Sequence, residues 1–97
     1  MDNKDRLFTI EEWEKYLHWL KNQIFKLLPL REENGGWEKF ASTLVWELRG
    51  ANFIEPRVPF MSLIFKLSAL GEITEFSVYR KTIFECINLV DKFELGD

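Results

Sequence analysis

The stretch 74–93 constrains the fold most, because apolar residues surround most of its circumference when it is drawn as a helix. At roughly 100° per residue, the apolar positions cover more than half of the wheel: Phe76, Tyr79, Ile83, Phe84, Cys86, Ile87, Leu89, Val90 and Phe93. The polar strip holds only Lys81, Glu85, Asn88 and Lys92. A helix that is apolar nearly all round requires neighbours on several sides. We therefore expect 74–93 to be the central helix of a small all-α domain.

A capping box predicts where the first helix begins. Thr9 is followed three residues later by Glu12, so each side chain can bond to the other residue's backbone amide. Pro29 is expected to end this helix, because proline lacks an amide and disfavours helical geometry at the residue before it. The predicted helix is 10–28, and its apolar stripe is Ile10, Trp13, Leu17, Leu20, Ile24, Leu27 and Leu28, with Tyr16 at the edge.

Two more apolar stripes with 3-4 spacing predict helices at 37–51 and 59–70. Gly50 and Asn52 are expected to end the former, and a short linker then brings Phe53 and Ile54 onto the core. Pro59 suits the first turn of the latter, and Gly71 should stop it. The last helix should be capped by Thr74.

The expected fold is therefore all-α, a compact bundle of four helices, about 10–28, 37–51, 59–70 and 74–93, with short connections. The 97 residues make one domain, 1–97, in which 1–8 are expected to form a flexible N-terminal segment. An apolar content of 46% provides enough surface for a folded core.

Charge and cysteine content point to a cytoplasmic protein. The formal charge of −3 disfavours general adhesion to nucleic acid or anionic membranes. The single cysteine cannot form an internal disulfide. The charged N-terminal residues precede no apolar segment of a signal peptide, and no apolar run approaches the ~18–20 residues of a membrane span. We expect no association with membranes.

Catalytic and ligand-binding groups are scarce. His18 is the only histidine and Cys86 the only cysteine, and both are explained by their places beside or within apolar stripes. No two His or Cys residues have the spacing of metal ligands. The only glycine pair, Gly35-Gly36, lacks the Lys and Ser/Thr of a phosphate-binding loop. We expect no enzyme activity, cofactor or metal.

Four large side chains do not fit the predicted stripes and are the candidate partner-binding residues: Trp19, Trp46, Met61 and Phe65. Each falls on a face that is otherwise polar or lies off the stripe of its helix. Aromatic residues are enriched at interface hot spots, and contiguous exposed apolar patches are unusual on monomers. The alternative explanation is that neighbouring helices or loops cover them.

The sequence favours a small, intracellular, non-enzymatic protein-binding domain, such as an adaptor, an inhibitor or an immunity-type regulator. By analogy with proteins of similar size and composition, it could be encoded by a phage or mobile element. The expected partner is another protein or a second copy of the chain in a homodimer.

The alternative function is a helix-turn-helix DNA-binding regulator using 59–70 and 74–93. Its nucleic-acid-binding residues would be Arg57, Lys66, Ser77, Arg80 and Lys81. Glu72, Glu75 and Glu85 lie between these cations and weaken the hypothesis.

Overall fold

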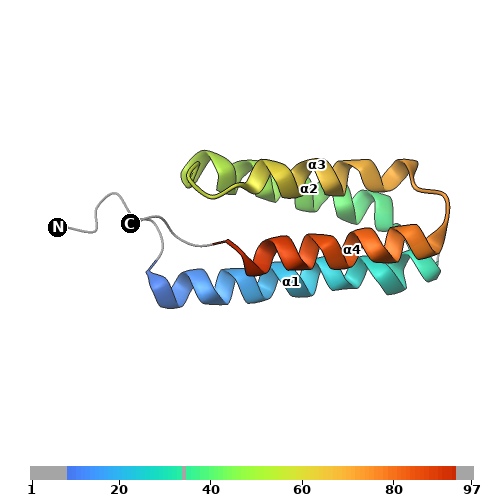
Figure 1. The fold of residues 1–97 in the computed structure, drawn as a ribbon, viewed down its shortest axis with the longest axis horizontal. Coiled ribbons are helices and arrows are strands. Elements are labelled where there is room, and N and C mark those ends of the chain that lie inside the picture. Colours follow the sequence, from blue (N-terminus) through green and yellow to red (C-terminus); the bar gives the residue numbers. More distant parts are fainter. Residues whose placement is uncertain (1–8, 34, 94–97) are drawn as a thin grey trace.

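Four helices follow one another in up-and-down order, each running opposite to the one before it (Figure 1). The computed structural model describes residues 9–33 and 35–93. Its helices are α1 (Ile10–Glu32), α2 (Trp37–Ile54), α3 (Phe60–Ser68) and α4 (Phe76–Asp91), and a 3₁₀ turn (Ala69–Glu72) continues α3. The described residues contain no strand. The predicted all-α bundle of four helices is confirmed, whereas the predicted flexible segment 1–8 lies outside the described residues.

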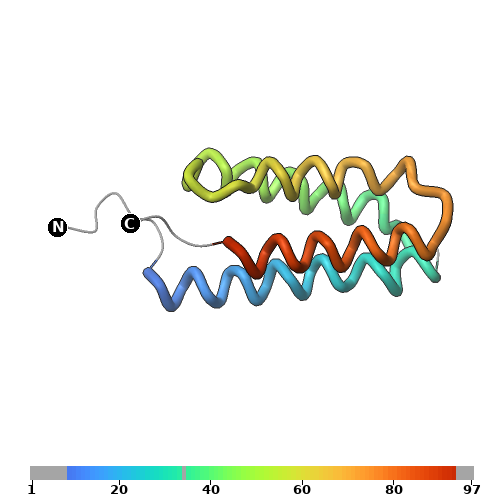
Figure 2. The backbone as a smooth tube through the Cα atoms, in the orientation of Figure 1, coloured from blue at the N-terminus to red at the C-terminus, as the bar shows by residue number. Residues whose placement is uncertain are grey.

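The helices form two closely packed pairs, α1 with α4 and α2 with α3 (Figures 1 and 2). Contacts between α1 and α2 and between α3 and α4 close the bundle. The core therefore lies among four helices, and its fully buried side chains include Leu20, Leu48, Leu63, Tyr79 and Ile83.

The helix α4 is one of four members of the bundle and is not enclosed by the others. Its residues Tyr79, Ile83 and Cys86 are buried, as the wheel predicted, but Val78 and Phe84 are exposed. Phe84 instead contacts Phe25 of α1 edge-on, with the ring centroids 5.8 Å apart. The prediction that α4 is central is therefore wrong. Part of its apolar surface, including Phe84, lies at the exposed edge of the contact between α1 and α4.

The capping box at the start of α1 is confirmed. The Thr9 amide donates to Glu12 Oε1 at 2.9 Å, and the Glu12 amide donates to Thr9 Oγ1 at 3.0 Å. Ile10, which was expected in the apolar stripe, is exposed instead, because it is the first helical residue and lies at the end of the bundle.

The prediction that α1 ends before Pro29 is wrong, since the helix continues to Glu32. Proline removes one helical hydrogen bond, but the following turn makes contacts that offset this loss. Arg31 Nη2 donates to the carbonyl oxygens of Ile73 at 2.6 Å and Thr74 at 3.3 Å. These bonds fix the last turn of α1 to the connection between α3 and α4.

The same guanidinium lies against two aromatic rings, 4.3 Å from the centroid of Tyr79 and 5.0 Å from that of Trp37. Cations placed over aromatic faces are attracted by the ring quadrupole. The Tyr79 hydroxyl in turn donates to the Leu27 carbonyl oxygen at 2.8 Å. Three helices, α1, α2 and α4, thus meet around Arg31 at this end of the bundle.

The prediction for the end of α2 is also wrong. The helix continues past Gly50 and Asn52 to Ile54, and Phe53 and Ile54 are exposed instead of covering the core. Buried Val58 of the connection covers the core at this end. The connection is held by a buried carboxylate, because Arg57 Nε donates to Glu55 Oε1 at 2.8 Å.

Two further boundaries differ from the prediction. Pro59 precedes α3 at the cap position, and helical structure passes through Gly71 as a 3₁₀ turn because buried Leu70 holds this segment on the core. Glu75, not Thr74, is the N-cap residue of α4, and it makes no side-chain cap bond. The Thr74 carbonyl oxygen instead accepts from Arg31.

Replacement of Ile83 by alanine should lower the free energy of unfolding by roughly 2–5 kcal/mol, because it leaves a cavity at a fully buried position. Denaturant titration measures the change. The matched control is Val78→Ala on an exposed position of the same helix, which should change stability by no more than about 0.5 kcal/mol. Equal losses for the two variants would contradict the described core.

Loss of the capping box should weaken the start of α1. Thr9→Ala is expected to cost on the order of 1 kcal/mol of stability, because it removes the bond to the Glu12 amide. Thr43→Ala is the control, since the Thr43 hydroxyl donates only to the Lys39 carbonyl oxygen within α2. An unfolding midpoint unchanged by Thr9→Ala would show that this cap adds no stability.

Candidate functional site

Three of the four most exposed large apolar side chains in the described residues belong to α2 and α3, and the fourth is Ile10 of α1. The exposed fractions are 78% for Phe53, 75% for Trp46, 66% for Phe65 and 41% for Met61. Trp46 and Phe53 are seven residues apart and share one side of α2, while Met61 and Phe65 are four apart and share one side of α3. These four residues are called the hairpin face below.

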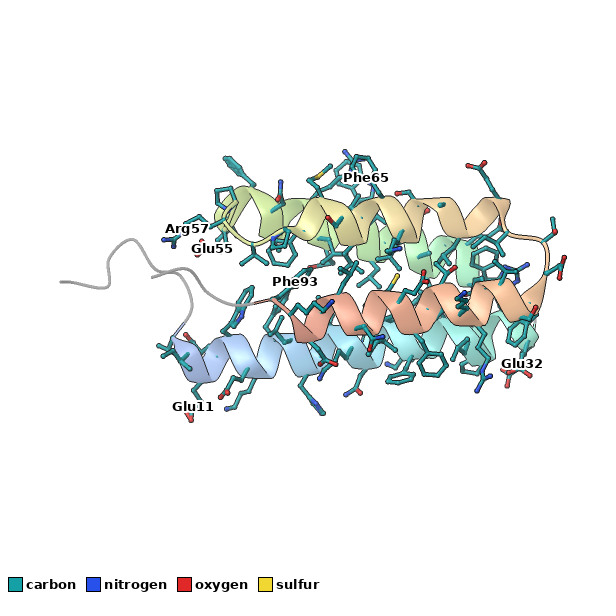
Figure 3. All side chains as sticks on the ribbon, viewed as in Figure 1. Glu11, Glu32, Glu55, Arg57, Phe65 and Phe93 are labelled. Carbon is teal, nitrogen blue, oxygen red and sulfur yellow. The ribbon has the colours of Figure 1, made fainter. Side chains whose placement is uncertain are left out.

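Trp46 is the one residue of the hairpin face that lines the groove between α2 and α3, and helical spacing places Met61 on the side of α3 that borders it. Trp46 lines the groove between α2 and α3 together with Ser68. Met61 precedes Ser68 by seven residues, so it lies on the same side of α3. The opposite flank of α3 faces α4, where Lys66 Nζ lies 3.4 Å from Glu85 Oε1. Figure 3 shows Phe65 pointing outward from α3, away from α1 and α4.

The groove between α2 and α3 has a volume of about 490 Å³. It is lined by Trp37, Glu38, Ala41, Ser42, Val45, Trp46, Arg49, Leu67, Ser68 and Gly71. Only two of these residues are charged, Glu38 and Arg49, and neither forms an ion pair within the described residues. A Cβ atom added to Gly71 would meet no atom within 4 Å, so the groove is open beside it.

The structure brings together three of the four predicted partner-binding residues, Trp46, Met61 and Phe65. The fourth, Trp19, lies on α1 and is 40% exposed. Its ring is tilted against Tyr16 with the centroids 5.7 Å apart. Burial, and secondly the nearby charge of Glu47 on α2, raises the pKa of Tyr16 to about 12. Trp19 therefore lies apart from the hairpin face, where it lines a second groove formed by residues of α1 alone.

Sequence reasoning missed Phe53, the most exposed residue of the hairpin face. It was assigned to a linker and to the core, because Gly50 and Asn52 were expected to end α2 before it. The signal that could have identified it is the seven-residue spacing from Trp46, which places both residues on one helical side when α2 is continued.

A smaller aromatic cluster lies between α1 and α4. Phe25 and Phe84 are both exposed, and their rings meet edge to face at 5.8 Å. The Arg80 guanidinium lies 5.4 Å from the Phe84 ring centroid. The side chains of this cluster therefore cover one another in part. No such mutual contact is described among the four residues of the hairpin face.

The residues of the DNA-binding hypothesis do not gather on one surface. Arg57 lies at the α2–α3 connection (Figure 3), whereas Ser77 and Arg80 stand near the start of α4, toward the other end of the bundle. Arg57 and Lys66 are paired with carboxylates, whereas Arg80 and Lys81 are exposed and have no such partner in the described residues.

The arrangement of α3 and α4 also differs from that of a helix-turn-helix. The two helices run lengthwise beside each other in opposite directions (Figures 1 and 2). The helices of a DNA-binding helix-turn-helix cross at roughly 90–120°. This geometry does not favour the DNA-binding hypothesis.

The two candidate nucleophilic or basic side chains do not form a pair. Cys86 is fully buried in the core, and burial raises the pKa of its thiol to about 12. His18 is exposed on α1. A buried neutral thiol is a poor nucleophile, so Cys86 serves as a small core residue.

Residues 9–33 and 35–93 contain no group of three His, Cys, Asp or Glu side chains that could hold a metal ion. Within the part of the chain that the structure describes, no helix combines the length and the apolar character that a membrane crossing requires. Comparison of the chain with protein-family models, curated proteins and solved structures found no match.

Burial of Cys86 predicts a loss of stability in alkali. The ordinary thiol pKa is 9.0 and the folded value is about 12, so between these values the unfolded chain releases a proton that the folded chain retains. The free energy of unfolding should therefore fall as pH rises through this window, by up to about 1.4 kcal/mol per pH unit from this group. Denaturant titrations between pH 8 and pH 10, values bracketing the ordinary thiol pKa, measure the slope.

The control for this prediction is Cys86→Ala. This variant should be less stable at every pH, yet its stability should decline less steeply above the ordinary thiol pKa, because no thiol remains to ionise. Two curves that run parallel over the same pH range would contradict a raised pKa for Cys86.

Proposed function

We propose that this chain is a small, non-enzymatic protein-binding domain that engages its partner through the hairpin face. The observation that carries the proposal is the exposure of Trp46, Phe53, Met61 and Phe65 on neighbouring sides of two helices. Folding of the single chain does not require these side chains, because the core is filled by other residues of the same helices.

The size of the hairpin face suits a protein interface. Aromatic side chains each offer about 150–250 Å² of surface, so the exposed parts of Trp46, Phe53 and Phe65 together amount to on the order of 450 Å². Met61 and the small residues around it extend this area toward the ~800 Å² that each partner contributes to a standard interface. Aromatic anchors with methionine beside them are typical of the centre of such interfaces.

The broader role we propose is that of an adaptor, an inhibitor or an immunity-type regulator in the cytoplasm, in the manner of small proteins carried by phages and mobile elements. Its support is the small size, the mild negative charge and the lack of paired catalytic groups among the described residues. The cytoplasmic location is supported by the single cysteine, which is a buried free thiol.

The partner can be identified by photo-crosslinking in cells that encode the chain. A benzophenone amino acid at position 53 places the reactive group within the hairpin face, and the same group at exposed Asn88 of α4 provides the control. We expect a discrete crosslinked protein from position 53 and none from position 88. Equal crosslinking from both positions would contradict a partner specific to the hairpin face.

Alanine substitution then measures the contribution of Trp46. Because this side chain is largely exposed, Trp46→Ala should leave the melting temperature within a few degrees of wild type while weakening binding of the crosslinked partner at least about tenfold. Trp19→Ala is the matched control on another side of the bundle and should leave the affinity nearly unchanged. The reverse result in calorimetric titrations would move the binding surface to α1.

A further inference from the structure

The groove beside Trp46 has opposite charges at its two ends. Glu38 and Arg49 both line it and both lack an ion-pair partner in the described structure. Eleven residues separate them on α2, which corresponds to about 16 Å along the helix axis. The two charges are equal and opposite. The groove of one copy is therefore complementary in charge to the groove of a second copy that runs in the opposite direction.

We propose that the partner bound at the hairpin face is a second copy of this chain, docked antiparallel so that Glu38 of each copy pairs with Arg49 of the other. This inference rests on the proposed function and names the partner of the same surface. A two-fold axis that is perpendicular to α2 and runs between the two copies, level with the midpoint of Thr43 and Leu44, produces both ion pairs at once. An unrelated partner would not require this symmetry of charge.

The same axis places Trp46 of one copy opposite Ala41 of the other, because the two positions are equally distant from the midpoint between Glu38 and Arg49. Ala41 and Gly71 are the smallest residues that line the groove, and the space beside Gly71 is open. In the dimer, the indole of Trp46 from one copy enters the groove of the other copy beside these two small residues. Apolar anchoring and charge pairing therefore select one alignment of the two copies.

The alignment also divides the hairpin face. Trp46 lies close to the axis and is covered in the dimer. Phe53 lies two helical turns further toward the α2–α3 connection and falls at the edge of the contact. Trp46→Ala should therefore weaken self-association at least about tenfold, whereas Phe53→Ala should weaken it by no more than about threefold.

Charge reversal tests the alignment directly. Glu38→Arg places two arginines opposite each other at both ends of the dimer, and Arg49→Glu places two glutamates there. Each variant alone should self-associate at least about tenfold more weakly than wild type. An equimolar mixture of the two variants should associate as well as wild type, because every arginine then faces a glutamate. Sedimentation of the full chain across micromolar to millimolar concentrations measures all three samples.

Two controls accompany the mixture. Lys39→Glu changes an exposed charge next to Glu38 that does not line the groove, and it should leave self-association within about threefold of wild type. The double variant Glu38→Arg with Arg49→Glu in one chain should associate as wild type does, which shows that the reversed chains still fold. Circular dichroism of each variant confirms its helical content.

The outcomes separate this inference from the proposed function. A monomeric wild type at every concentration, or a mixture that does not associate, overturns the symmetric dimer. If position 53 then still crosslinks to a different protein, the proposed function stands with another partner. If the wild type is monomeric and position 53 yields no specific product, the proposed function fails as well.

Discussion

The contacts of Arg31 hold together the end of the bundle on which the rest of the fold depends. One guanidinium joins the last turn of α1 to the carbonyl oxygens that precede α4 and to the rings of Trp37 and Tyr79. Two carbonyl dipoles and two aromatic faces replace part of the water around its charge, whereas its Nη1 atom is buried without a hydrogen-bond partner in the described structure. This arrangement fixes where the chain enters α4, next to the last turn of α1.

The opposite end of the α2–α3 pair is held by a different polar contact. Glu55 is buried in the connection and accepts from exposed Arg57. Removal of only one partner of such a pair leaves an uncompensated buried charge. The helical stretches between the two ends are joined mainly by apolar side chains, so polar contacts set where the chain turns and apolar contacts set which sides of the helices meet.

The sequence contained enough information to predict the class of the fold, the four helices and the capping box, because these depend on residues that are near one another along the chain. The ends of α1 and α2 could not be predicted in the same way. Pro29 has a local cost that is visible in the sequence, whereas the compensating bonds of Arg31 join residues 42 and 43 positions apart. Local signals alone therefore placed the helix end too early.

The candidate site was predicted in part for the same reason. Trp46, Met61 and Phe65 were identified because each disagrees with the stripe of its own helix. Their gathering on one surface depends on how α2 packs against α3, which a single helical wheel does not contain. Phe53 was misplaced because the error in the end of α2 removed it from the helix, and Trp19 was grouped with residues that lie on a different side of the bundle.

The burial of Cys86 has a practical consequence for studies of this protein. The single thiol of the chain lies in the core, and its pKa is about 12, so it reacts slowly with maleimides or spin-label reagents at neutral pH. A cysteine introduced at one exposed position then becomes the only fast-reacting site. Fluorophores or spin labels can therefore be attached to either side of the bundle one at a time, without first removing the native cysteine.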